Sequence, residues 1–227
     1  MSGDGALGPR VDWTPSRPPA RESLTGAHVR LEPFADAHRD ALHRALHGDG
    51  ADGLWDYLPY GPFDERAWRD WFAASAASAD PLFYAVVGRA DERPVGQGSY
   101  LRIDPEHGSI EIGHLAFGPA LQRTPGATEA VFLLARHAFD ELGYRRVEWK
   151  CNALNERSRA AALRLGFEFE GVFRQHMVVK GRNRDTAWYA IVDGDWPRVR
   201  AAHEEWLRPG NFDGAGRQRR TLASLRA

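Results

Sequence analysis

The spacing of apolar residues along the chain switches repeatedly between the two-residue period of a strand and the 3.6-residue period of a helix. The pattern predicts a short strand over residues 28–34, followed by helices over residues 36–47 and 64–78. In the second helix, Trp68, Trp71 and Phe72 fall on one side, which we expect to face the core.

A strand-rich block and two further helix–strand units follow. Turn-like segments, "RADER" and "DPEHG", separate the strands predicted over residues 82–88, 94–103 and 109–117. Further on, helices are predicted over residues 125–142, 155–166 and 195–207, and strands over residues 144–151, 167–179 and 184–192. This order predicts one α/β domain, with a mixed, mostly antiparallel sheet of about seven strands flanked by helices.

The two ends of the chain differ from this central domain, which we place at residues 22–197. Residues 1–21 are rich in Gly and Pro and predict a flexible or docked arm, with Trp13 as the residue that attaches it. Residues 198–227 contain the end of the last helix and a basic tail without apolar periodicity. The run "RQRR" in that tail is typical of a solvated end.

Composition narrows the class of protein. The chain has 227 residues, 43% of them hydrophobic, and a net charge of −1, so no global field favours nucleic acid or a membrane surface. The single cysteine, Cys151, forms no intrachain disulfide, and no apolar run approaches the ~20 residues of a spanning helix. His43 and His47 stand one helical turn apart, but no third ligand is evident, so we expect no metal. We therefore expect a soluble, cytoplasmic protein, with self-pairing as a homodimer through an edge strand or the terminal arms left open.

The segment "LQRTPGATEAVFLLARHAFDELG" has a structural interpretation. Thr124 suits the N-cap of a helix, Pro125 its first position, and Gly143 its end. Val131, Leu134, Ala138 and Leu142 recur on one helix face that we expect to be buried.

The start of the same helix also fits a phosphate site. Free backbone N–H groups and the helix dipole favour an anion there, and Arg123, Thr124 and Thr128 add side-chain donors. Both interpretations stay open on these residues alone.

Three ordered segments add a resemblance. "SIEIGHLAF", "LQRTPGATEA" and "NALNERSRAAALRLGFEFEG" resemble the central region of GNAT N-acetyltransferases, in particular their Rim-type (RimJ/RimL-like) branch, over about residues 24–197. The family's acyl-CoA loop reads Gln/Arg-x-x-Gly-x-Gly/Ala. Gln122 and Ala127 match its ends, whereas Pro125 replaces the central glycine and removes one amide donor.

The resemblance implies a fold, a co-substrate and a set of site residues. It implies the GNAT fold and acetyl-CoA as acyl donor, with Asn155 at the pantetheine arm and Ser158 as the acid that protonates the departing thiolate. The remaining residues implied at the acyl-CoA are Leu115, Ala116, Phe117, Gln122, Arg123, Thr124, Gly126, Ala127 and Thr128.

Glu111 is the first candidate for the base. Strand alternation places Gly113, Leu115 and Phe117 on its face, and apolar neighbours should raise the pKa of its carboxyl group. The alternative is a solvated carboxylate paired with a basic residue on a neighbouring strand. His114, expected on the opposite face, is the competing base, and a covalent role for Cys151 is the least favoured.

The segment "LWDYLPYGPF" places four aromatic residues in a loop between two helices. These residues form either a small separate core or one wall of an acceptor cleft, with Trp55, Tyr57 and Tyr60 in contact with the acceptor. Asp56 would then attract a cationic amine.

The function that these observations favour is an acyl-CoA-dependent N-acyltransferase. It would transfer acetyl to a protein N-terminus or a small-molecule amine by direct attack in a ternary complex. The alternative from another class is a non-catalytic acyl-CoA-binding or sensing module. Pro125 supports the alternative, and Glu111, Asn155 and Ser158 oppose it, because a sensor needs no acid–base pair.

Overall fold

One mixed sheet with helices on both faces organises the chain. The computed structural model describes residues 8–226, and within them the sheet has eight strands in the order β1-β2-β3-β4-β5-β6-β8-β7. Neighbouring strands are antiparallel except for the parallel pair β5–β6. The strands are β1 (Leu24–Thr25), β2 (Val29–Pro33), β3 (Leu82–Gly88), β4 (Arg93–Asp104), β5 (Ser109–Phe117), β6 (Arg146–Asn152), β7 (Glu168–Val179) and β8 (Arg182–Val192).

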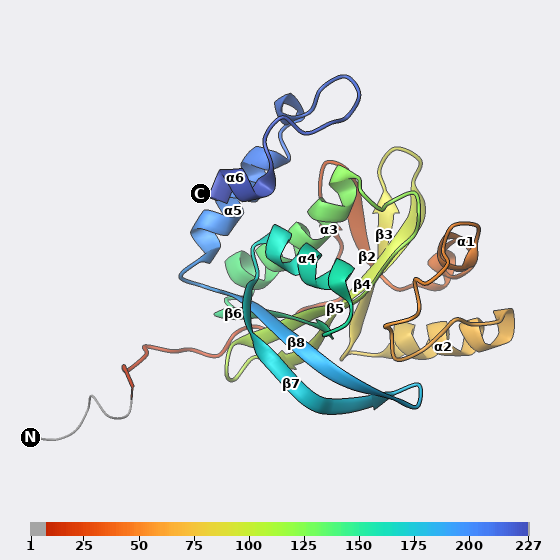
Figure 1. Cartoon of the computed structure of the whole chain (residues 1–227), viewed down its shortest axis with the longest axis horizontal. Helices are drawn as coiled ribbons and strands as arrows, with labels where there is room; N and C mark the ends of the chain where they lie inside the picture. The colour runs from red at the N-terminus through yellow and green to blue at the C-terminus, as the bar shows by residue number, and fades with distance from the viewer. Residues whose placement is uncertain (1–7, 227) are drawn as a thin grey trace, which may run out of the picture.

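The helices divide between the two faces of the sheet (Figure 1). The helices are α1 (Arg39–His47), α2 (Glu65–Ala77), α3 (Pro125–Arg136), α4 (Glu156–Leu165), α5 (Trp196–Trp206) and α6 (Leu222–Arg226), and α3 continues as a short π-helix over His137–Glu141. Buried residues of α3, α4, α5 and α6 join one apolar core with the sheet, whereas α1 and α2 build a second core on the other face. The predicted α/β class and mixed sheet are confirmed, with β1 as one strand more than expected.

Local sequence accounts for several helix ends. Asp64 caps α2 by accepting a hydrogen bond from the Ala67 amide, and Trp68 and Phe72 are buried as predicted. The helix α3 begins as its sequence predicts, with Thr124 as N-cap and Pro125 at the first position. All four residues predicted on its inner face, Val131, Leu134, Ala138 and Leu142, are buried.

A buried carboxylate fastens the first turn of α3 to the start of the sheet. Glu129 accepts hydrogen bonds from the backbone amides of Ala27, His28 and Val29, at 2.7, 2.6 and 2.8 Å. Gly26 is needed beside it, because a Cβ there would lie 2.4 Å from the Glu129 carboxyl carbon. The turn between β1 and β2 is therefore held by a helix distant in sequence.

Both ends of the described chain pack on the domain. Trp13 donates its indole N–H to the Glu106 carbonyl at 2.8 Å, and Ser16 binds the Pro105 carbonyl, so the described part of the arm is docked. The basic run at residues 217–220 is exposed, as expected of a solvated end, but the segment that contains it is folded against the domain. Residue Leu222 of α6 is buried, and the Trp206 indole donates to Gln218 at 2.7 Å, because the segment folds back onto α5.

Candidate active site

The parallel strands β5 and β6 separate soon after they meet. Their ladder consists of three residue pairs and ends at Glu111 opposite Glu148. Beyond that point β5 pairs only with β4, and β6 only with β8. The separated edge of β5 leaves backbone N–H and C=O groups free for a ligand, and α3 and α4 begin at the same end of the two strands.

A bulge interrupts β5 just beyond this separation. The partners Ser99–Gly113 and Gln97–Ala116 leave two residues of β5, His114 and Leu115, opposite one residue of β4, and His114 has a φ of 51°. As a result, Leu115 and Phe117 pack with the same core as Ile110 and Ile112. The His114 ring lies 5.2 Å from Phe83, in the second core.

The bulge corrects the predicted facing of this strand. Alternation was expected to keep Leu115 and Phe117 on the side of Glu111 and to place His114 on the other side. The extra residue reverses the alternation, so His114 shares the face of Glu111 and the two apolar side chains leave it.

Glu111 is buried against cations rather than apolar side chains. Its side chain is 5% exposed, and Oε2 accepts from Arg102 Nη1 at 2.6 Å and pairs with Lys150 Nζ at 3.1 Å. Burial raises the pKa of this carboxyl group, and the two cations oppose that rise. The predicted rise in pKa and the alternative's pairing with basic residues on neighbouring strands both agree with the structure, whereas the expected apolar surroundings and the expected solvation were wrong.

The second carboxylate oxygen of Glu111 is uncommitted. Both ion pairs use Oε2, and in the described chain no hydrogen bond reaches Oε1. The atom is not among the fully buried, unpartnered side-chain atoms, so it touches solvent. Gly113 leaves this space open, because a Cβ on Gly113 would lie 3.3 Å from Oε1.

A chain of ion pairs extends from Glu111 across the strands. Lys150 also pairs with Glu148 at 2.6 Å, Glu148 with Arg146 at 2.8 Å, and Arg146 with Glu170 at 2.5 Å. The Lys150 ammonium lies 3.7 Å from the centre of the Trp188 ring. These partners fix the Glu111 carboxylate from the β6 side.

His114 forms a second polar group with a tyrosine from the loop between α1 and α2. Tyr60 Oη lies 2.8 Å from His114 Nδ1, the two rings stack 5.4 Å apart, and Gln97 Nε2 lies 3.5 Å from Tyr60 Oη. Burial lowers the pKa of His114 to about 4 and raises that of Tyr60, so both side chains are neutral at pH 7. The neutral imidazole has one protonated nitrogen, so this bond forms with the phenol donating to Nδ1 in one tautomer and with Nδ1–H donating to the phenol oxygen in the other.

The aromatic loop is mostly core. Trp55 is 4% exposed, stacks on His47 and donates its indole N–H to the Leu46 carbonyl at 3.1 Å. Phe63 and Tyr60 pack in the same core, which matches the separate-core alternative for this segment. Asp56 is exposed.

The loop is also fastened to distant parts of the chain. Lys180, at the turn between β7 and β8, donates to the Trp55 carbonyl at 2.7 Å, and Tyr57 donates to the Leu154 carbonyl at 3.2 Å. The hairpin β7–β8 therefore reaches the loop between α1 and α2, on the sheet face of Glu111 and His114 (Figure 1).

The start of α4 places Ser158 beside β6. Asn155 caps the helix by accepting from the Ser158 amide at 3.1 Å, as its sequence predicts. The Ser158 hydroxyl accepts from the Trp149 indole at 3.0 Å, which leaves its own proton available to a neighbour such as the Cys151 thiol. Burial raises the pKa of Cys151, which disfavours the thiolate that a covalent mechanism needs.

At the start of α3, most polar side chains already have partners within the protein. Thr124 Oγ1 binds the Leu121 carbonyl at 2.7 Å, Gln122 donates to the Phe117 carbonyl at 2.7 Å, and the buried Thr128 hydroxyl accepts from Arg164 at 3.0 Å. Gly126 packs tightly, since a Cβ there would lie 2.9 Å from Val29, and Ala127 supplies the amide for the cap. Arg123 is the exception, exposed and with a φ of 61°.

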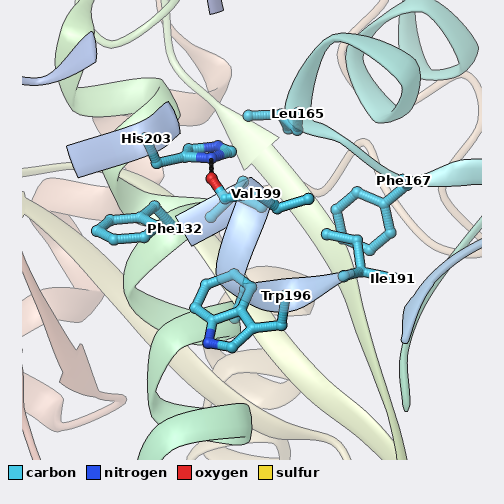
Figure 2. Close-up of a pocket in the computed structure, with 9 residues that line it drawn as sticks. Phe132, Leu165, Phe167, Ile191, Trp196, Val199 and His203 are labelled. Atoms are coloured by element: carbon cyan, nitrogen blue, oxygen red, sulfur yellow. Dashed lines mark hydrogen bonds between the residues drawn. The ribbon is translucent and has the colours of Figure 1, made fainter. Parts of the chain in front are cut away.

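A small, mostly apolar pocket lies elsewhere. Figure 2 shows it between α3 and α5, lined by apolar side chains that include Phe132, Ile191 and Trp196, together with His203. His203 Nδ1 donates to the Val199 carbonyl at 2.9 Å, and burial lowers the pKa of its ring to about 4. The lining has no carboxylate or hydroxyl and no open strand edge beside it, so the candidate site is the region around β5 and β6.

Sequence reasoning did not identify the cations and polar partners of this site. Arg102, Lys150 and Gln97 were not singled out, because their meeting with Glu111 and His114 depends on strand register. Across residues 8–226, no three His, Cys, Asp or Glu side chains gather as metal ligands. None of the helices in that range has the length and apolarity to cross a membrane.

Comparisons with known proteins agree with this geometry. The family model described as "Acetyltransferase (GNAT) domain" matches residues 28–168. A crystal structure of a GCN5-related N-acetyltransferase from Brucella melitensis is 47% identical and superimposes with a TM-score of 0.93, covering 95% of this chain and 98% of that one.

More distant relatives are also acetyltransferases by name. The uncharacterized N-acetyltransferase YoaA of Bacillus subtilis is 29% identical over 121 residues, which is 53% of this chain and 68% of that protein. The ribosomal-protein-S5-alanine acetyltransferase from Vibrio fischeri is 16% identical with a TM-score of 0.62, over 77% of this chain and 98% of that one, and this likeness concerns the fold alone.

Proposed function

The chain belongs to the GNAT acetyltransferase family, and on that premise we propose that it transfers acetyl from acetyl-CoA to a primary amine by direct attack in a ternary complex. The amine is a protein N-terminus or a small molecule. The observation that carries the proposal is the separation of β5 from β6 directly after Glu111, because it puts a buried carboxylate with one free oxygen where the open edge begins.

The residues present fit an acyl-CoA. The edge of β5 from Leu115 to Phe117 offers backbone groups to an extended chain, and the start of α3 offers Arg123 to its phosphates. Asn155 would lie beside the pantetheine arm. Pro125 supplies no amide, the Thr124 hydroxyl donates to the Leu121 carbonyl, and the Thr128 hydroxyl is buried, so Arg123 is the main donor at the pyrophosphate.

The thioester supplies an activated acetyl group, and the protein supplies proton transfer and alignment. Glu111 Oε1 accepts a proton from the amine, directly or through water, since burial raises the pKa of this group toward a useful range for a base. Backbone N–H groups of the β5 edge stabilise charge that develops on the carbonyl oxygen. Ser158 donates the proton that the thiolate takes up.

His114 has a different role in this scheme. Its Nδ1 is hydrogen-bonded to Tyr60, which fixes the ring, and the neutral ring orients substrate or water on the face of Glu111. This replaces its predicted role as a competing base.

The test is a comparison of Glu111→Gln with the wild type, following CoA release from acetyl-CoA over a panel of amines. Loss of the base should lower turnover by about 10²–10⁴-fold while acetyl-CoA affinity stays within about twofold. Glu106→Gln, on the exposed turn before β5, is the matched control, and the folding of each variant is checked by its melting temperature.

Two outcomes would contradict the proposal. Wild-type turnover that survives in Glu111→Gln would remove Glu111 as the base. Acetyl-CoA binding without CoA release on any amine would support the alternative, a module that senses acyl-CoA.

The predicted homodimer and cytoplasmic location stay predictions. β7 is an edge strand with exposed Phe169, Phe173 and Val178, which makes it a candidate surface for self-pairing. Sedimentation velocity across a concentration series measures that association directly.

A further inference from the structure

Arg184 is a half-buried cation without a carboxylate. It lies on β8, and no Asp or Glu of residues 8–226 comes within ion-pair distance of its guanidinium. The neighbouring cations of the same face differ, because Arg102 pairs with Glu111 and Lys150 pairs with both Glu111 and Glu148. Burying a cation without a counter-charge is unfavourable, and such groups concentrate where a ligand supplies the charge.

The guanidinium is held by one edge and open at the other. Arg184 Nε donates to the Thr186 hydroxyl at 3.2 Å, and that hydroxyl also contacts His176 Nδ1 at 2.9 Å. Thr186 is 1% exposed, so this anchor is rigid. Neither Nη of Arg184 has a hydrogen-bond partner in the described chain, which leaves the two donors that bind a carboxylate side by side.

Arg184 lies near the proposed reacting groups. On β6 the ladder with β8 ends at Asn152 opposite Thr186, so Arg184 continues β8 past the end of β6, toward the space where β5 and β6 have separated. Its charge contributes to lowering the pKa of His114, and Glu111 and Cys151 act on its own pKa. Strand alternation also puts Arg184 on the face of Trp188, whose ring lies 3.7 Å from the Lys150 ammonium that pairs with Glu111, so Arg184 is on the side of the candidate base.

A second unpartnered donor lies on the same strand face. The indole N–H of Trp188, four residues along β8 from Arg184, is buried and has no hydrogen-bond partner. The Trp188 ring packs between Lys150 and Phe173, so the donor is fixed in place. Unsatisfied buried donors are uncommon, and this one shares the strand face of the unpaired arginine.

We propose that Arg184 binds a carboxylate carried by a substrate of the acetyltransferase reaction, so that carboxylate-bearing substrates are favoured over neutral and cationic ones. This inference rests on the proposed function. The carboxylate belongs either to the amine acceptor, as in an amino acid, or to the acyl group of the donor, as in a dicarboxylic acyl-CoA. A phosphate would call for several free cations, but Arg102 and Lys150 are already bound to carboxylates.

Two kinetic arms distinguish these sources. The first compares amino acids with their carboxamides as acceptors of acetyl from acetyl-CoA. The second compares succinyl-CoA with acetyl-CoA as donors to a neutral amine. In one of the two arms the wild type should prefer the carboxylate form by about tenfold to a hundredfold in kcat/KM.

The variants assign this preference to Arg184. Arg184→Gln should bring the ratio close to one by raising KM for the carboxylate form, and Arg184→Lys, which keeps the charge but loses the fork, should restore part of it. Arg182→Gln changes an exposed arginine two residues away and should leave the ratio as in the wild type. A ratio near one in both arms of the wild type, or a preference that persists in Arg184→Gln, would overturn the proposal.

A binding measurement separates this proposal from the proposed function. Saturation-transfer NMR compares N-acetyl amino acids with their carboxamides, and succinate with succinamide, in the presence of CoA. Stronger carboxylate signals that vanish in Arg184→Gln would support the site even if no amine were acetylated. Equal signals within each pair, or none, together with measurable acetyl transfer, would reject the carboxylate site and leave the proposed function intact.

Discussion

The start of α3 and the sheet face around Glu111 both carry polar residues at positions that suggest a ligand, yet they differ in what those residues already bind. At the start of α3, Thr124 and Thr128 are engaged in a helix cap and in a contact with Arg164. On the sheet face, Glu111 keeps one oxygen free and Arg184 keeps both terminal nitrogens free.

The difference shows that a residue can occupy a motif position without being free to contact a ligand. A hydroxyl at the start of a helix serves the backbone first, because an uncapped amide is costly. Only polar groups without a partner inside the protein are available for substrate, such as Arg123 at the start of α3 and Arg184 on the sheet face. The following predictions test that distinction.

The largest expected effect is on stability, from Lys150→Met. This change leaves the buried carboxylates of Glu111 and Glu148 each without one cation, so the free energy of unfolding should fall by about 3–5 kcal/mol in chemical denaturation at pH 7. Arg69→Met, which breaks an exposed pair with Glu65, should change it by less than about 0.5 kcal/mol. A loss below about 1 kcal/mol in Lys150→Met would mean that the chain of ion pairs from Glu111 does not stabilise this face of the sheet.

The next effect concerns pH and His114. Its pKa in the folded protein is about 4, below the ordinary 6.5, so the unfolded chain binds more protons between these values. The free energy of unfolding should therefore rise between pH 4 and pH 6.5 and fall again when the solution is acidified. His114 contributes about 3 kcal/mol at most to this change.

His203 adds to the same rise in the free energy of unfolding with pH, because its pKa in the folded protein is also about 4. Denaturation curves at pH 7 and pH 4.5 measure the combined slope, and His114→Gln should flatten it. An unchanged slope in that variant would show that His114 is accessible to protons rather than held neutral.

A smaller effect is expected on acyl-CoA affinity. Arg123→Ala removes the free cation at the start of α3 and should raise the dissociation constant of acetyl-CoA about tenfold, measured by calorimetry. Arg66→Ala, on the exposed side of α2, is the control. If Thr128→Ala weakens binding as much as Arg123→Ala, the hydroxyl is a cofactor contact after all and the contrast between the two regions disappears.

The smallest effect is that of Thr124→Ala. Loss of the cap should lower the free energy of unfolding by about 1 kcal/mol, while acetyl-CoA affinity changes by less than about twofold. Thr124→Ser keeps the hydroxyl and should recover most of the stability. A drop in affinity larger than the drop in stability would assign the hydroxyl to the ligand.

Sequence alone predicted the parts of the fold that depend on neighbouring residues. The caps at Thr124 and Asn155, Pro125 at the first position of α3 and the buried side of α2 follow from local pattern. The family also followed from ordered motifs, and the match over residues 28–168 confirms it.

The features that sequence did not predict depend on distant contacts. A positive φ at His114 could not be predicted from its sequence, since only a few per cent of residues other than glycine adopt one, and the bulge reverses the faces of the strand beyond it. The partners of Glu111 and the free Arg184 follow from register across four strands. The C-terminal segment lacks periodicity because single residues such as Leu222, rather than a repeating face, attach it.

The bulge in β5 makes the length of this strand as important as its composition. Before His114 the odd-numbered Glu111 faces the second core, and after it the even-numbered Ala116 does. Deleting His114 would restore unbroken pleating and keep Leu115 and Phe117 on their core face, but it would remove the ring that meets Tyr60. The extra residue therefore adds the His114 ring to the face of Glu111 while the apolar side chains that follow it stay in the core.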